Sequence, residues 1–181
     1  MRVIAGSLKG RRLKTPDWDG LRPTSDKLRE TLFNILAPRI AGARVLDAFA
    51  GTGALGIEAL SRGAVAVTFI EQDRRAQALI AENLAHCRIE TGYTVERASL
   101  SRAVLQLRKD ARFDIVLLDP PYDEPAGPVL ADIEGLVASS GLVVLEHARR
   151  TEVPEGAGRL ARVRQVMSGD SALSLYELRS G

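Results

Sequence analysis

The fold is decided by one stretch, Val45-Leu46-Asp47-Ala48-Phe49-Ala50-Gly51-Thr52-Gly53, in which an apolar strand ends in a carboxylate and turns through glycines. Residues 54–60 follow with the composition of a helix. A strand, turn and helix of this kind form a nucleotide cradle, because glycines let backbone N–H groups approach a ligand and the helix N-terminus carries partial positive charge. The stretch therefore predicts an α/β domain with a nucleotide site where this strand ends.

The identity of the nucleotide depends on Asp47. Gly51, Gly53 and Gly56 also fit the dinucleotide fingerprint, although that pattern by itself has many false matches. A carboxylate four residues before the first glycine would repel a pyrophosphate. S-adenosylmethionine carries an ammonium, a sulfonium and no phosphate, so the cradle favours this cofactor over NAD.

The rest of the chain alternates between strands and helices. A helix is expected at 128–137, and the expected strands are 45–47, 66–71, 93–98, 113–118, 141–146, 159–166 and 172–178. No helix separates the last two strands, so they form a hairpin that brings an antiparallel strand into a parallel sheet. We predict a Rossmann-like domain over 24–181 with a seven-stranded, mostly parallel sheet, and a small N-terminal β-hairpin arm over 1–23.

Two further strand ends carry candidate site residues. Glu71 lies 20 residues after Gly51, where an acid can accept both ribose hydroxyls, although it could also be a plain surface acid. The tetrapeptide Asp119-Pro120-Pro121-Tyr122 follows a strong apolar strand. Its prolines have fixed dihedrals, so they hold the neighbouring side chains rigidly at the ligand-binding edge of the sheet.

This tetrapeptide suits methylation of an exocyclic amine. The lone pair of such an amine is delocalised into the base, so the enzyme must localise it in the transition state. The Asp119 carboxylate and the Pro120 carbonyl are expected to accept the amine N–H groups while Tyr122 stacks on the base. Cys87 lies at a predicted helix end, away from these motifs, and does not fit a carbon-methylating thiolate mechanism.

The charge of the chain is uneven. Residues 1–30 hold eight Lys or Arg and four Asp or Glu, whereas the remainder holds 17 and 19. This composition predicts an arm that binds a polyanion such as RNA, although a solvated basic hairpin without a partner is the alternative. The cations expected to bind RNA are Arg2, Lys9, Arg11, Arg12 and Lys14.

Composition also sets limits. One cysteine and two histidines, Cys87, His86 and His147, are too few for a disulfide or a zinc site, so we expect no metal. No apolar run approaches 18 residues, and Met1 opens a basic stretch rather than a signal peptide. We expect a cytoplasmic monomer without a membrane partner.

The motifs together resemble a known family. The cradle, Glu71 and Asp119–Tyr122 look like the motifs of class I S-adenosylmethionine methyltransferases that act on exocyclic amines. The stretches Arg2–Gly6, Gly10–Leu13, Leu21–Thr24 and Arg29–Asn34 resemble the RsmD family, the bacterial 16S rRNA guanine-N2 methyltransferases. The resemblance covers essentially the whole chain.

The resemblance implies that Asp119–Tyr122 hold the target base of 16S rRNA, either as naked RNA or in the assembled small subunit. It implies cofactor contacts from Asp47, Ala50, Gly51, Thr52, Gly53, Glu71, Gln72, Ala98 and Ser99, with Arg22 and Thr24 near the methionine end. Relatives commonly carry an acidic or amide residue before the alanine at the adenine edge, whereas this chain reads Arg97-Ala98-Ser99-Leu100. Ser99 or backbone groups near Ala98 are expected to take that contact.

Other functions stay open at this point. Adenine-N6 in DNA or a glutamine amide in a protein would use nearly the same tetrapeptide. A nicotinamide-dependent oxidoreductase is opposed by Asp47 and has no use for residues 119–122. An RNA-binding module without a cofactor leaves the cradle, Glu71 and the proline turn unexplained.

Overall fold

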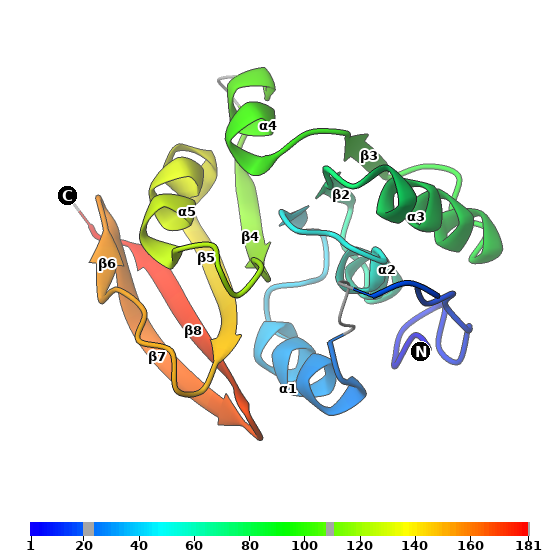
Figure 1. Cartoon of the computed structure of the whole chain (residues 1–181), viewed down its shortest axis with the longest axis horizontal. Coiled ribbons are helices and arrows are strands. Elements are labelled where there is room, and N and C mark those ends of the chain that lie inside the picture. Colours follow the sequence, from blue (N-terminus) through cyan, green and yellow to red (C-terminus); the bar gives the residue numbers. More distant parts are fainter. Residues whose placement is uncertain (20–23, 108–110, 181) are drawn as a thin grey trace.

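The structure is a computed structural model that describes residues 1–19, 24–107 and 111–180. Within these residues one sheet has eight strands in the order β3-β2-β1-β4-β5-β8-β7-β6 (Figure 1). The pairs among β1 to β5 are parallel, and those among β5 to β8 are antiparallel. The strands are β1 Arg44–Asp47, β2 Ala66–Ile70, β3 Tyr93–Glu96, β4 Phe113–Leu118, β5 Val137–Ala148, β6 Gly156–Ala157, β7 Leu160–Ser168 and β8 Ser171–Leu178.

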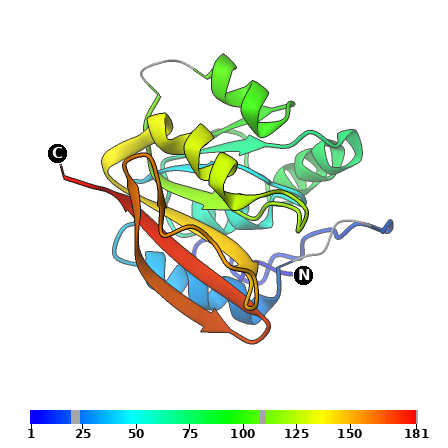
Figure 2. The ribbon, with the colours of Figure 1, turned by 60° about the vertical axis from the view of Figure 1, so that its left-hand side comes forward.

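Helices cover both faces of the sheet, as Figures 1 and 2 show. The helices are α1 Asp26–Leu36, α2 Ala54–Ser61, α3 Arg74–His86, α4 Leu100–Gln106, α5 Ala126–Ile133 and the 3-10 turn η1 Glu134–Leu136. Successive strand residues alternate between two cores, so Val45 packs with α1 to α3 and Leu46 packs with α4 and α5. No helix in the described ranges is long and apolar enough to cross a membrane.

The predicted fold class is confirmed, with two differences in the strands. The sheet gains β6, which has two residues, pairs with β7, and is too short to show an alternating pattern. Strand β5 begins at Val137 rather than Gly141, because the chain leaves α5 at Ile133 and passes through η1. Its pairing with β4 is irregular between Phe113 and Ile115, which separates this first part of β5 from the regular ladder.

The N-terminal arm is a loose hairpin that lies against the domain. A single bridge joins Arg2 to Arg12. Val3 and Leu13 are 1% and 4% exposed and belong to the core beneath α1 to α3, which the basic composition of the arm did not predict. The turn between them hydrogen bonds to the end of α2, where Ser7 N–H donates to the Ser61 carbonyl at 2.8 Å.

A buried ion pair fastens the arm. The Glu58 carboxylate of α2 accepts the backbone N–H groups of Ile4 and Ala5 at 2.8 and 3.0 Å. Arg29 of α1 lies 3.8 Å from that carboxylate, and its Nη2 donates to the Arg2 carbonyl at 2.8 Å. The side chains of Arg29 and Glu58 are fully buried, so both helices and the arm meet at one buried charged contact.

Arg29→Met is expected to lower the free energy of unfolding by about 3 kcal/mol, the low end for breaking a buried pair, because Arg62 still pairs with Glu58 at 2.8 Å. The matched control is Glu82→Gln in the exposed pair with Lys14, which should cost less than about 1 kcal/mol. Urea denaturation measures both values. Equal losses in the two variants would contradict a structural role for the buried pair.

Candidate functional site

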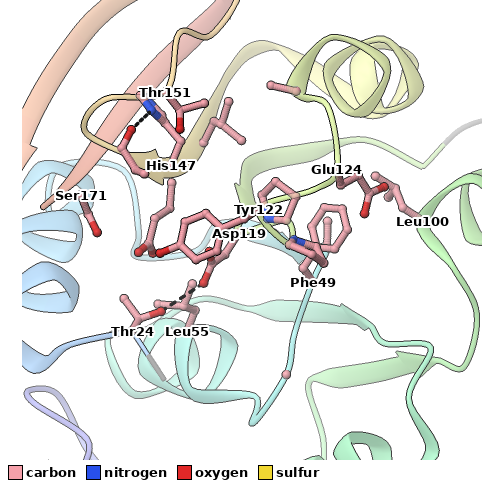
Figure 3. A pocket seen from close by; sticks show the side chains of 18 of the residues that line it. Thr24, Phe49, Leu55, Leu100, Asp119, Tyr122, Glu124, His147, Thr151 and Ser171 are labelled. Carbon is pink, nitrogen blue, oxygen red and sulfur yellow. Dashed lines mark hydrogen bonds between the residues drawn. The ribbon is translucent and has the colours of Figure 1, made fainter. Parts of the chain in front are cut away.

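A pocket of about 1210 Å³ opens where the parallel strands end. Its walls come from the loops after β1, β2, β3, β4 and β5, together with the turn between β7 and β8. This is the edge at which open α/β sheets bind ligands. Figure 3 shows Phe49, Asp119 and Tyr122 gathered in the pocket, with Thr24 and Leu55 on one side and His147 on the other.

Two glycines shape the cradle. Gly53 begins α2 with a φ of 78°, a left-handed conformation that side chains disfavour. Gly56 lies so close to β2 that a Cβ atom would be 2.2 Å from the Phe69 ring. The helix can therefore rest directly on the sheet, and its N-terminus points at the pocket.

The structure corrects the expected role of Asp47. Its side chain is 1% exposed, and Oδ2 accepts the Gly56 N–H at 2.9 Å. In the described part of the chain, the pocket lining includes Ala50, Gly51 and Thr52 but not Asp47 or Gly53. Asp47 thus lies beneath the pocket, where its buried carboxylate supports the turn and α2 through the Gly56 hydrogen bond.

Burial also changes the charge of Asp47. Loss of solvation raises the pKa of this carboxyl to about 7, the Gly56 hydrogen bond opposes the rise, and the negative charges of Asp119 and Glu71 add to it. The pocket therefore has a carboxyl group beneath it that titrates near neutral pH.

Glu71 joins the cradle to the end of β2. Its Oε2 accepts the Gly51 N–H at 2.8 Å, and its Oε1 accepts the Asp73 N–H at 2.8 Å. Each carboxylate oxygen keeps a second lone pair, so both can still accept a hydroxyl from a ligand. Glu71 also lines the pocket, which makes it the carboxylate that faces the cavity beside the glycine turn.

The other predicted cofactor residues fall into two groups. Those that line the pocket are Gln72, Ala98, Ser99 and Thr24. Ser99 precedes α4, but its side chain makes no capping hydrogen bond to that helix. Arg22 lies outside the described residues, so its predicted place cannot be compared with the structure.

The predicted tetrapeptide reaches the same pocket. Thr24 Oγ1 donates to Asp119 Oδ2 at 3.3 Å, so the segment before α1 meets the end of β4. Burial raises the pKa of Asp119 to about 6, and the Thr24 hydrogen bond opposes this rise. Pro120 and Pro121 line the pocket, the Pro121 carbonyl closes a turn with Glu124 N–H at 2.9 Å, and Tyr122 is 78% exposed. An acceptor and an accessible aromatic ring therefore lie side by side.

Among the pocket residues that sequence reasoning missed, Phe49, Glu146 and His147 bear most on its chemistry. Phe49 lies inside the quoted cradle but was given no role, and it lines the same pocket as Tyr122 (Figure 3). Glu146 and His147 lie near the end of β5, and His147 Nε2 lies 2.8 Å from Ser174 Oγ. The signal was available, because Asp47, Glu71 and Glu146 all stand at or just after the end of an apolar strand.

The predicted RNA-binding cations are exposed but stand apart from the pocket. None of Arg2, Lys9, Arg11, Arg12 and Lys14 is among its described lining residues. Lys14 Nζ pairs with Glu82 at 3.0 Å. Trp18 lies under Arg75 of α3, with the guanidinium carbon 4.9 Å from the ring centre, so a cation–π contact anchors the loop before α1 to that helix.

The family model described as conserved hypothetical protein 95 matches residues 1–177. The chain belongs to this family. Ribosomal RNA small subunit methyltransferase D of Escherichia coli K12 is a relative that is 38% identical over 98% of this chain and 89% of its own length. The predicted resemblance to the RsmD family is confirmed.

Solved structures agree with this membership. A candidate methyltransferase from Escherichia coli, yhhF, superposes with a TM-score of 0.86 and is 36% identical, covering 100% of this chain and 99% of its own. A hypothetical protein from Thermus thermophilus has a TM-score of 0.84 and 31% identity, covering 98% of this chain and 99% of its own. This chain thus has the class I methyltransferase fold.

The free energy of unfolding of Asp47→Asn, taken relative to that of the wild type, is expected to be larger at high pH than at low pH. A carboxyl whose pKa rises on folding binds more protons in the folded state, so wild-type stability falls as pH rises from about 4 through about 7. The asparagine does not titrate, and its carbonyl can still accept the Gly56 N–H. The variant should gain about 2 to 3 kcal/mol relative to wild type between pH 5 and pH 8. Urea unfolding at both values measures this gain, and a constant difference would disprove the buried titration.

Proposed function

We propose that this protein transfers a methyl group from S-adenosylmethionine to the exocyclic N2 amine of a guanine in 16S rRNA. The observation that carries the proposal is one pocket that joins the glycine cradle and Glu71 to the Asp119 carboxylate and the exposed Tyr122 ring. A cofactor site and an amine-binding site thereby share one cavity. The domain over 24–181 performs the reaction, and the arm over 1–23 binds RNA.

The cradle supports the choice of cofactor. Glu71 accepts a backbone N–H from the turn at Gly51, and neither residue offers a cationic side chain that would bind a pyrophosphate. Each Glu71 oxygen keeps a lone pair that can accept a ribose hydroxyl. Thr52, Gln72, Ala98 and Ser99 also line the pocket. One solved methyltransferase candidate of the same fold, 17% identical with a TM-score of 0.70, is complexed with SAH.

The tetrapeptide supports the choice of reaction. When bound, the cofactor supplies an electrophilic methyl group on a sulfonium. Asp119 Oδ2 is held by Thr24, and together with the Pro120 carbonyl it can accept the amine hydrogens and localise the nitrogen lone pair. Tyr122 and Phe49 offer aromatic faces for the base, a kind of contact worth about 1 to 3 kcal/mol per stacked base.

The relatives support the choice of substrate. The Escherichia coli relative is named for small-subunit ribosomal RNA, and the Bacillus subtilis relative YlbH for rRNA. A tRNA (guanine(10)-N2)-dimethyltransferase of Methanothermobacter thermautotrophicus is 38% identical over 54% of this chain and 27% of its own length. A donor amine on guanine fits the carboxylate and carbonyl acceptors at residues 119 and 120.

Methyl transfer from labelled cofactor is the direct test, with 16S rRNA, assembled small subunits, duplex DNA and protein as acceptors. We expect label in N2-methylguanine, from naked rRNA or from subunits. Asp119→Ala should reduce kcat about 100- to 1000-fold while cofactor affinity stays nearly unchanged, because the carboxylate acts on the amine in the transition state. The control Tyr122→Phe should keep most of the activity because the ring remains.

Other labelled products would revise the proposal in defined ways. N6-methyladenine in DNA or methylglutamine in protein would reject the rRNA substrate and keep the amine methyltransferase. Tight binding of NAD without any response to S-adenosylmethionine would reject the cofactor. Near-normal turnover of Asp119→Ala would reject the amine-binding role of that carboxylate.

The salt dependence of RNA binding tests the arm. Deleting the arm would remove Val3 and Leu13 from the core, so point substitutions are the better design. Each phosphate neutralised on a single strand contributes about −0.7 to the slope of log affinity against log salt. Arg11→Gln/Arg12→Gln should therefore flatten the slope by about 0.7 to 1.4 units. The control Arg44→Gln/Arg179→Gln removes two exposed arginines that lie outside the arm and should leave the slope unchanged. Equal slopes for both double variants would favour a solvated hairpin without a partner.

A further inference from the structure

A second carboxyl group stands beside Asp119 in the pocket. Strands β4 and β5 are parallel, and their register pairs Leu118 with Leu145. The next residues are Asp119 and Glu146, so the two acids follow paired positions on neighbouring strands, which lie about 4.8 Å apart. Both side chains line the same pocket, and the reaction described above uses only Asp119.

The surroundings of Glu146 make it a polar group that faces the cavity. The hydroxyls of Thr24 and Ser171 lie within its reach, and Figure 3 shows both residues at the pocket wall. Burial, and after it the negative charge of Asp119, raise the pKa of Glu146 to about 8, against the opposing hydrogen bonds of Thr24 and Ser171. Because two negative charges on neighbouring strand ends repel each other, the pair carries about one proton near pH 7, and the pKa of Glu146 is raised more than that of Asp119. Glu146 is then the neutral partner, with one O–H donor and one C=O acceptor.

Guanine has a matching edge. Its N2 amine stands beside the N1–H donor, and the O6 acceptor follows on the far side of N1. If the amine is held at Asp119, the N1–H and O6 groups extend along the edge toward the neighbouring strand, over a distance similar to the strand spacing. A neutral carboxyl complements these two groups, because its C=O accepts the N1–H and its O–H donates to O6.

We propose that Glu146 identifies the target base as guanine by hydrogen bonding its N1–H and O6 groups while Asp119 holds the N2 amine. The inference rests on the proposed function and adds a specificity-determining residue to it. An adenine whose N6 amine lay at Asp119 would present the N1 acceptor and a C–H group at the same positions. It would keep one hydrogen bond to the carboxyl and lose the other, which leaves the Glu146 carbonyl oxygen unpaired.

The base analogue 2-aminopurine provides the sharpest test, because it keeps the amine and replaces N1–H and O6 by a lone pair and C–H. It is placed in a synthetic RNA segment at the guanine identified by the methyl-transfer assay, and the segment is ligated into 16S rRNA and assembled where assembly is needed. The wild-type protein should prefer guanine over 2-aminopurine in kcat/KM by about 10- to 100-fold, the range for lost polar contacts in a site built for them.

Two substitutions separate hydrogen bonding from bulk. Glu146→Met keeps the length of the side chain without its donor and acceptor, and should bring the guanine preference close to one. Glu146→Gln keeps a C=O acceptor and an N–H donor, and should hold the preference within about threefold of wild type. The control Glu152→Met changes an exposed acid on the same pocket wall and should leave the preference unchanged.

Each outcome bears on the inference. A wild-type preference near one, or an undiminished preference in Glu146→Met, would overturn it. Loss of S-adenosylhomocysteine binding would show that Glu146→Met does not fold. In that case the guanine preference of the wild type and of Glu146→Gln decides the question. A loss of preference in Glu146→Gln contradicts the neutral-carboxyl contact. An RNA with inosine at the target lacks the amine, so methylation there would refute the proposed function rather than the role of Glu146.

Discussion

The hydrogen bond from Gly56 N–H to the buried Asp47 carboxylate is the contact on which the other arrangements depend. It ties the first turn of α2 to the end of β1, and Gly56 lets that helix rest against Phe69 of β2. The inner end of α2 is thereby fixed at the pocket, where the turn residues Gly51 and Thr52 are presented. The opposite end of the same helix carries Glu58 and Ser61, which hold the arm. One short helix therefore sets the positions of both the cradle and the basic surface.

Much of the fold and part of the candidate site followed from the sequence, because strand ends and glycine turns are local features. Glu71, Asp119 and Tyr122 were placed in the pocket by a rule that needs only the strand order. Asp47 was assigned a ligand contact because its burial depends on α2, which no local pattern reveals. Glu146 was missed because no turn motif follows it. Its place in the site depends on Asp119, which is 27 residues earlier in the sequence and is brought beside it by the β4–β5 pairing. The docking of the arm rests on Val3 and Leu13, two apolar residues in a basic segment.

The carboxyl groups along the pocket edge act as a coupled set. Asp119 raises the pKa values of both Asp47 and Glu146, and Glu71 also raises that of Asp47. A cation placed beside the cradle would oppose the shift of Asp47, because an opposite charge favours the ionised form. Binding a positively charged ligand at this edge is thus linked to release of protons from the protein. A neutral ligand of the same shape would lack that linkage.

The attachment of the arm also constrains the order in which the chain can acquire its structure during synthesis. Ile4 is held by a residue 54 positions later, and the Lys14 backbone by Asn83, 69 positions later. At about 5 to 20 residues per second, the ribosome needs several seconds to supply these partners after the arm itself has been made. The nascent arm therefore spends that interval without its partners in α2 and α3, and its docking waits for both helices. Any sequence that lengthens the interval, such as a slowly translated stretch within 15–83, would prolong the exposure of Val3 and Leu13 to chaperones and proteases.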